Sequence, residues 1–222
     1  IFDVPPSQVL AAFTAAASLD NSIARIEDVS AVLDQLESWN ADPQHGLYQT
    51  LDLGAVGMSG HSFGAVTTQA VSGQTLFTTA SATRDARIMA ARPLSPSVPS
   101  LGSAELAFAS VDIPWLLMTG SNDNAPVEGV GSDVAGRLAV YPALPEGEFY
   151  ELVLFEGEHH AFTDRELGAT QKARNPAHHG IIQALSTAFW DATLRGDLSA
   201  ARWLRGEGAL SVLEPGDSWQ FR

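Results

Sequence analysis

Three residues of the types used in nucleophilic catalysis occur along the chain in the order serine, aspartate, histidine: Ser62, Asp123 and His159. A serine hydroxyl is a weak nucleophile, and it attacks an acyl carbon only when a histidine removes its proton and a carboxylate orients that histidine. In doubly wound sheets, each of these groups follows the carboxyl end of a strand. The order therefore predicts acyl-transfer chemistry, provided that the fold brings the three residues to one edge of a sheet.

The serine stands at the centre of the turn Gly60-His61-Ser62-Phe63-Gly64, which follows the apolar run 53–58 and precedes the small-residue run 65–71. A Gly-x-Ser-x-Gly turn between a strand and a helix strains the serine backbone and lifts its hydroxyl above the sheet edge. Both glycines are expected to be needed because the strand and the helix pass too closely for a Cβ atom. The backbone N–H of Phe63, the residue after the nucleophile, is the predicted oxyanion-hole donor.

Asp123 is the candidate carboxylate because it lies in the polar loop after the apolar run 113–120. Asp133 is its nearest competitor, but it belongs to the start of a predicted helix. Asp112 precedes its strand and would lie at the opposite edge of the sheet. An Asx-turn role in the loop is the alternative for Asp123 itself, since Ser-Asn-Asp-Asn is turn chemistry in its own right.

Two adjacent residues, His159 and His160, are candidates for the base, because both follow the apolar run 150–155. Only one of the two side chains can face the serine. His61 is expected to pack beside the turn, and the pair at 178–179 is expected to lie on the surface or to cap a helix. A histidine base predicts activity that rises with pH near the ordinary histidine pKa of roughly 6.5.

The sequence favours neither a metal site nor a nucleotide site. The potential metal ligands are Glu158, His159, His160, Asp164, His178 and His179. Adjacent histidines rarely bind one ion, and neither a His-x-x-x-His nor a His-Glu-x-x-His spacing is present. No glycine-rich phosphate-binding motif follows a strand. We therefore expect neither a metal nor another cofactor.

The elements that must position these residues alternate between strand and helix. The predicted strands cover 53–58, 87–91, 113–120 and 150–155, and the predicted helices cover 8–17, 20–39, 65–71, 132–140, 181–192 and 200–204. The first strand does not alternate, which predicts burial on both faces, and Pro93 is expected to end the second run. This alternation predicts the α/β class with a parallel sheet.

The composition of the chain limits the size of its core and the kinds of molecule it is expected to bind. At 222 residues and 45% hydrophobic content, the chain can form one domain with a sizeable core. Twelve lysines and arginines against 26 acidic residues give a net charge of −14, which disfavours nucleic acid and anionic membrane surfaces as partners. No apolar run approaches the roughly 18 residues of a membrane span. The absence of cysteine excludes disulfides and thiolate sites, and leaves the redox compartment open.

Five segments spread over nearly the whole chain carry a family resemblance: Arg25 to Val29 with Leu33 to Leu36, Gly60 to Gly64, Met118 to Asp123, Glu158 to Phe162, and Ala188 to Ala192. They resemble the α/β-hydrolase superfamily, and within it the predicted dienelactone hydrolases related to bacterial platelet-activating-factor acetylhydrolase-like and polyester-degrading esterases. The resemblance implies the α/β-hydrolase fold and a serine carboxylic-ester hydrolase that uses a small-molecule ester and no cofactor.

The resemblance also bears on the base. In that branch the base looks like the histidine of an acidic-His-x-x-Phe pattern, which falls on His159. The older dienelactone pattern, His-x-Phe, falls on His160. The segment Phe189-Trp190-Asp191 favours His159, and both histidines remain candidates.

Members of the family carry about four strands and a helix before the position that matches Ile1, on the order of 80 to 100 residues that include the second oxyanion loop. The sequence is therefore expected to be a fragment, to work with a separate N-terminal segment, or to build its oxyanion hole elsewhere, for example from residues 2–6. A four-stranded sheet with an uncovered edge would favour a homo-oligomer. The rival to a hydrolase is a non-catalytic hydrolase-like subunit, and a peptidase or an acyltransferase remains an alternative among enzymes.

Overall fold

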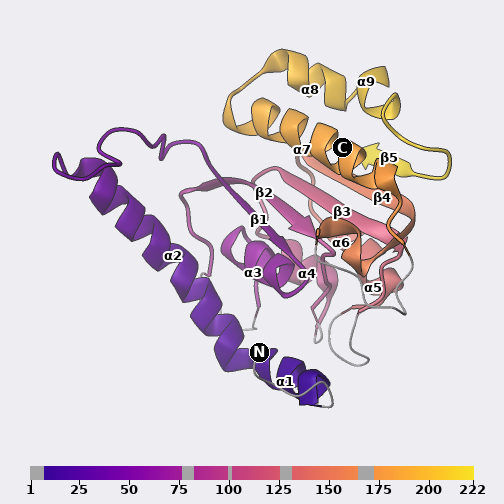
Figure 1. The fold of residues 1–222 in the computed structure, drawn as a ribbon, viewed down its shortest axis with the longest axis horizontal. Coiled ribbons are helices and arrows are strands. Elements are labelled where there is room, and N and C mark those ends of the chain that lie inside the picture. The colour runs from indigo at the N-terminus through magenta and orange to yellow at the C-terminus, as the bar shows by residue number, and fades with distance from the viewer. Residues whose placement is uncertain (1–7, 77–82, 100–101, 126–131, 165–172) are drawn as a thin grey trace.

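The computed structural model describes residues 8–76, 83–99, 102–125, 132–164 and 173–222 (Figure 1). Its sheet has the order β1-β2-β3-β4-β5, and the strands are Val56–His61, Ile88–Leu94, Trp115–Asn122, Phe149–Glu158 and Ser218–Phe221. Strands β1 to β4 are parallel, whereas β5 runs antiparallel to β4. The prediction of the α/β class with a mainly parallel sheet is confirmed.

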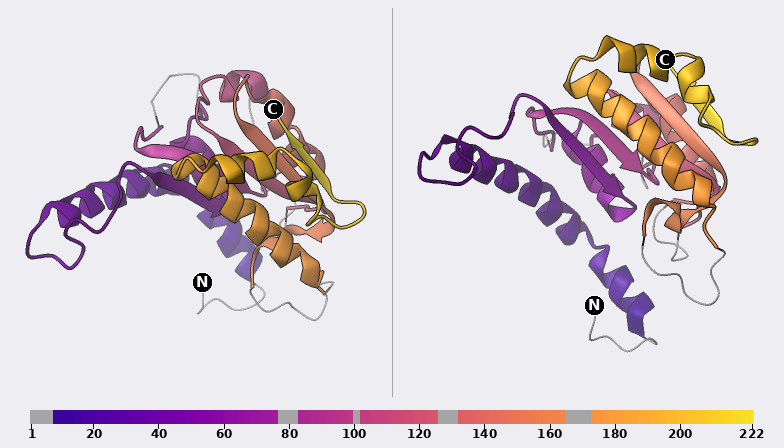
Figure 2. Two further views of the ribbon diagram at one scale, coloured as in Figure 1. Left: turned by 90° about the horizontal axis from the view of Figure 1, so that it is seen from above. Right: turned by 45° about the horizontal axis from the view of Figure 1, so that its top comes forward.

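Helices cover both faces of this sheet (Figures 1 and 2). They are α1 Val9–Ala16, α2 Leu19–Ala41, α3 Phe63–Val71, α4 Ala104–Phe108, α5 Val134–Leu138, α6 Val140–Ala143, η2 His159–Phe162, α7 Pro176–Leu194, α8 Leu198–Leu204 and α9 Glu207–Leu210. Apolar side chains of α2, α3, α4 and α6 form one core layer with Trp115 and Leu117 of β3. Side chains of α7, α8 and α9 form the other layer with Leu116 and Met118.

Strand β3 reads as an unbroken apolar run because both of its faces are covered. Its successive residues point alternately into the two layers, so that no polar alternation is needed. Strand β1 lies at the edge of the described sheet and differs from the prediction. It covers 56–61 rather than 53–58, and Gly57 and Ser59 are exposed. The expectation of burial on both faces was therefore wrong for β1, since an edge strand is covered less completely than an inner one.

Strand β2 continues through Pro93 instead of ending before it. Proline lacks the N–H that a sheet ladder uses. Its position is tolerated because the pairing of β2 with β3 is sparse, with register partners Ala91–Trp115 and Leu94–Met118 on either side of Pro93. The longer strand carries the chain to Ser95, at the sheet edge where the candidate site lies.

Several other boundaries differ from the predictions. Helix α2 begins at Leu19 and is capped by the Ser18 hydroxyl, which accepts the Asn21 N–H at 3.2 Å. The predicted helix 132–140 is divided into α5 and α6, and α4, α9 and β5 were not predicted. In the part of the chain that the structure describes, no helix has the length and apolar character needed to cross a membrane.

Candidate active site

Ser62 occupies the sharp turn between β1 and α3. Its backbone has φ 59° and ψ −118°, a conformation that a residue with a side chain adopts only at a cost. The turn is fixed at both ends, because the Ser62 N–H donates to the Leu94 carbonyl at 3.0 Å and the Ser62 carbonyl accepts the Ala65 N–H at 2.8 Å. The strain therefore persists in a hydrogen-bonded frame, as expected of a strand-turn-helix nucleophile position.

The two glycines of the turn have different roles. A Cβ atom on Gly60 would lie 2.2 Å from the Gly64 carbonyl oxygen, so the close approach of strand and helix requires glycine there. A Cβ atom on Gly64 would meet no heavy atom within 4 Å beyond its own helix backbone. The prediction that both positions need glycine is thus confirmed for Gly60 and wrong for Gly64.

The loops that follow β1, β3 and β4 bring the three predicted polar residues together. The His159 Nε2 atom lies 2.8 Å from the Ser62 Oγ atom. The Nδ1 atom of the same ring lies 2.7 Å from an Asp123 carboxylate oxygen. Both distances are within hydrogen-bonding range, so the imidazole can exchange a proton with the hydroxyl while the carboxylate fixes its orientation.

Asp123 is completely buried, with 0% of its surface exposed. Its second carboxylate oxygen accepts hydrogen bonds from the Ser95 hydroxyl at 2.6 Å and the Thr119 hydroxyl at 2.9 Å. Burial raises the pKa of Asp123, but the hydrogen bond with His159, the charge of Arg137 and the Ser95 hydroxyl outweigh it and hold the pKa below its usual value. The carboxylate is therefore ionised at neutral pH.

Arg137 of α5 is a functional candidate that sequence reasoning missed. Only 2% of this residue is exposed. Its guanidinium donates to the carbonyls of Ser95, Pro96 and Asp123 at 2.5, 3.1 and 2.7 Å. Its Nε atom lies 3.1 Å from the Asp123 carboxylate, and its Nη2 atom lies 3.3 Å from the Nδ1 atom of His159. The available signal was an arginine inside the otherwise apolar run 134–140.

His61 packs against the candidate base. Its ring centroid is 4.6 Å from that of His159 and 5.8 Å from that of Phe162. Burial and the neighbouring His159 lower the pKa of His61 to about 4. His61 is therefore neutral at neutral pH and forms an uncharged wall beside the His159 ring, in line with the expected packing role.

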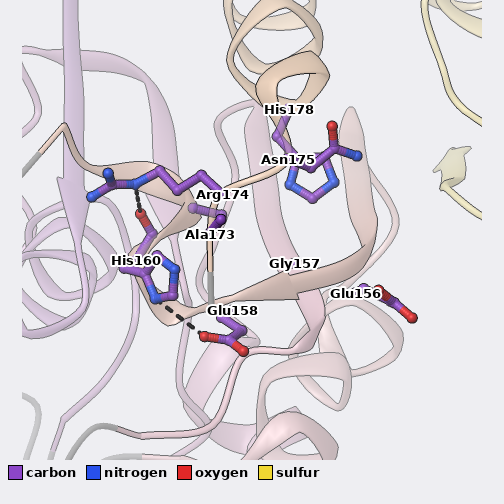
Figure 3. Close-up of a pocket in the computed structure, with 9 residues that line it drawn as sticks. Glu156, Gly157, Glu158, His160, Ala173, Arg174, Asn175 and His178 are labelled. Carbon is purple, nitrogen blue, oxygen red and sulfur yellow. Dashed lines mark hydrogen bonds and ion pairs between the residues drawn. The ribbon is translucent and has the colours of Figure 1, made fainter. Parts of the chain in front are cut away.

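His160 lines a small cavity of about 20 Å³ between η2 and the start of α7 (Figure 3). Its Nδ1 atom lies 3.3 Å from the Glu158 carboxylate, and its carbonyl accepts the Arg174 Nε–H at 3.0 Å. His178 also lines this cavity and is 3% exposed, so the prediction of a surface position was wrong for it. His179 is exposed, with Asp164 at 3.3 Å.

The remaining predicted positions fall as follows. Phe63 is the first residue of α3, where the backbone N–H groups have no intrahelical acceptor and can bind an oxyanion. Asp133 caps α5 by accepting the Gly136 N–H at 2.8 Å, and Asp112 pairs with Arg84 at 2.7 Å before β3 begins. Neither competes with Asp123. Residues 2–6, the suggested substitute oxyanion segment, lie outside the described residues.

Among the described side chains, no group of three or more His, Asp and Glu residues is arranged to hold a metal ion. Comparison with known proteins adds no family to this picture, since no family model and no curated protein matches the chain.

Proposed function

We propose that the chain is a serine carboxylic-ester hydrolase of α/β-hydrolase fold. The observation that carries the proposal is the continuous relay from the Ser62 hydroxyl through His159 to Asp123, with hydrogen-bond distances of 2.8 and 2.7 Å. The strained turn that presents the serine supports the same chemistry. Burial of the carboxylate with a full set of donors supports its role as the group that orients the histidine.

The reaction would begin when the Ser62 Oγ atom attacks the ester carbonyl carbon while His159 Nε2 takes the hydroxyl proton. The carbonyl electron pair moves onto oxygen, and the resulting oxyanion is bound by the N–H of Phe63 at the positive end of α3. Asp123 stabilises the imidazolium that has formed. Collapse of the intermediate breaks the bond to the alcohol, which leaves with the proton from His159, and Ser62 retains the acyl group.

Water then removes the acyl group by the same steps. His159 takes a proton from the water molecule, whose oxygen forms a bond to the acyl carbon, and the second tetrahedral intermediate releases the carboxylic acid. The proton returns to the Ser62 oxygen. No oxidation, reduction or external co-reactant other than water is needed.

A fluorophosphonate probe tests this proposal directly, because phosphonylation requires both an activated serine and a working oxyanion site. Peptide mass spectrometry should find the label on Ser62. The label should be lost in His159→Ala and retained in His160→Ala, which removes the adjacent imidazole that faces the cavity of Figure 3. Absence of label on the folded wild-type chain would contradict the hydrolase proposal and favour the non-catalytic subunit. Preferred transfer to an added alcohol instead of water would indicate an acyltransferase.

A further inference from the structure

The guanidinium of Arg137 joins three loops that carry the candidate active site. It binds Ser95 and Pro96 after β2, Asp123 after β3, and lies against His159 after β4. A buried cation is costly unless it is paired and fully hydrogen-bonded. Burial lowers the pKa of this guanidinium, while Asp123 acts in the opposite direction. Arginine still remains charged, because its ordinary pKa lies so far above neutral pH.

The position of this charge matters more than its burial. Asp123 attracts a proton onto His159, whereas a cation 3.3 Å from the Nδ1 atom opposes protonation of the same ring. Arg137 also lies 3.1 Å from the carboxylate oxygen that His159 contacts, so it neutralises part of the charge that would favour an imidazolium. Both effects have the same sign, and both favour the free base.

The other groups around the His159 ring do not offset this effect. His61, at the end of β1, is neutral at neutral pH because its pKa is lowered to about 4. Glu158 is directed toward His160. Among the described residues, the charged groups in contact with the ring are therefore Asp123 from the loop after β3 and Arg137 from α5.

We infer that Arg137 is a positioning residue that sets the proton affinity of His159 and keeps the imidazole unprotonated to lower pH than Asp123 alone would allow. The catalytic consequence of this role rests on the proposed function. The effect of the guanidinium on the titration of His159 can be measured without any substrate. Two properties of the Arg137 side chain are needed. Its positive charge acts on the imidazole, and its planar, forked set of N–H donors holds the loops after β2 and β3 in register.

The experiment compares Arg137→Gln, which removes the charge, with Arg137→Lys, which keeps the charge but loses the planar fork. The His159 ring is followed by histidine NMR from pH 4 to 9, with His159→Gln used to assign its signals. In Arg137→Gln we expect the titration midpoint of His159 to rise by about one pH unit. In Arg137→Lys the midpoint should stay near the wild-type value. In Arg137→Gln, the acidic limb of the pH profile of ester hydrolysis should move in parallel with the His159 midpoint. In Arg137→Lys, turnover should fall about tenfold because the loops that carry the site are aligned less well.

Arg87→Gln is the matched control. Arg87 also uses its guanidinium to bind a buried carboxylate, that of Asp85 at 2.6 Å, but it lies before β2 begins, at the opposite end of the sheet. Its loss should lower stability and leave the His159 titration unchanged. If Arg137→Gln does not fold, Arg137→Met provides a second neutral side chain of similar length.

Two results would overturn the inference: an unmoved His159 midpoint in a folded neutral variant, or wild-type turnover in Arg137→Lys. A wild-type chain that hydrolyses no ester and takes no fluorophosphonate would instead contradict the proposed function. In that case the NMR titration would still decide whether Arg137 controls His159.

Discussion

Two carboxylates buried to a similar extent behave in opposite ways in this molecule. Asp123, in the loop after β3, is 0% exposed, and Glu151, near the start of β4, is 3% exposed. The pKa of Asp123 is held below its usual value, whereas burial raises the pKa of Glu151 to about 6, against a weaker lowering effect of Gln220. Burial alone therefore does not decide the charge of a carboxylate here.

The difference lies in the partners. Both oxygens of Asp123 are hydrogen-bonded, and a guanidinium lies 3.1 Å away. Glu151 accepts one hydrogen bond from Gln220 of β5, and its other oxygen has no partner among the described residues. Donors and a cation stabilise an ionised carboxylate inside a protein, while an under-partnered one retains its proton more readily. Asp123 thus belongs to a hydrogen-bonded network that stabilises its charge, whereas Glu151 is buried without enough partners to do so.

The largest expected effect comes from replacing each of the two carboxyl groups by an amide. Asp123→Asn should lower kcat for ester hydrolysis by about 10⁴-fold, because the amide no longer stabilises the imidazolium and favours the wrong histidine tautomer. Glu151→Gln removes a buried carboxyl at the opposite end of the sheet and should change kcat by less than about twofold, since substitutions away from the site usually have small effects. The measurement is steady-state hydrolysis of a chromogenic ester at pH 7.5, with circular dichroism to confirm folding. Equal losses in both variants would remove the distinction between the two carboxylates.

A smaller effect is expected from removing one donor of Asp123. Ser95→Ala deletes the hydroxyl 2.6 Å from the carboxylate and should lower the free energy of unfolding by about 2 kcal/mol at pH 7, as for hydrogen bonds to charged groups. Because this bond favours the ionised form, the deficit should shrink as the pH falls below the ordinary aspartate pKa of 3.8. Urea unfolding at several pH values gives both quantities.

Ser72→Ala is the matched control for that variant. Ser72 is equally buried, but its hydroxyl donates to the backbone carbonyl of Thr68 at 2.5 Å and not to a charged group. Its loss should cost about 1 kcal/mol with no dependence on pH in the acidic range. A pH-independent deficit in Ser95→Ala would mean that its hydroxyl does not favour the ionised carboxylate.

The sequence was most informative where function depends on local pattern. Ser62, Asp123 and the adjacent candidates His159 and His160 could be placed at one edge of the sheet because they follow recognisable apolar strands, and parallel strands end at one edge of a sheet. The strand pattern alone did not choose between the two histidines. The fold class followed from the same alternation. The strict requirement for Gly64 was wrong because it was argued from a motif, whereas the actual contact depends on the local path of α3.

The parts that could not be predicted depend on partners far apart in the chain. Arg137 binds Ser95 across 42 residues, and nothing in the sequence near either residue indicates the other. Strand β5 has only four residues, and it is ordered by pairing with β4 rather than by its own pattern. Short elements and buried polar networks are determined by tertiary contacts, which local propensity does not record.

The last test concerns the dependence of stability on Glu151 ionisation. The pKa of Glu151 in the folded chain, about 6, lies above the ordinary glutamate value of 4.5, so the folded state holds the proton more tightly than the unfolded state. This contribution to stability is fully present below pH 4.5 and is lost as the pH rises through 6. A shift of this size corresponds to about 2 kcal/mol.

Glu151→Gln keeps the shape of the protonated carboxyl but cannot ionise. We therefore expect the free energy of unfolding of Glu151→Gln, minus that of the wild type, to increase by about 2 kcal/mol as the pH rises from 4.5 to 7.5. Gln220→Leu, which removes the donor on β5, should extend the pH range over which the wild-type glutamate stays protonated. Urea unfolding of the three chains at the two pH values measures these differences. If the difference in free energy of unfolding between the wild type and Glu151→Gln is the same at both pH values, Glu151 ionises as freely in the folded chain as in the unfolded one. The contrast with Asp123 in carboxylate charge would then be wrong.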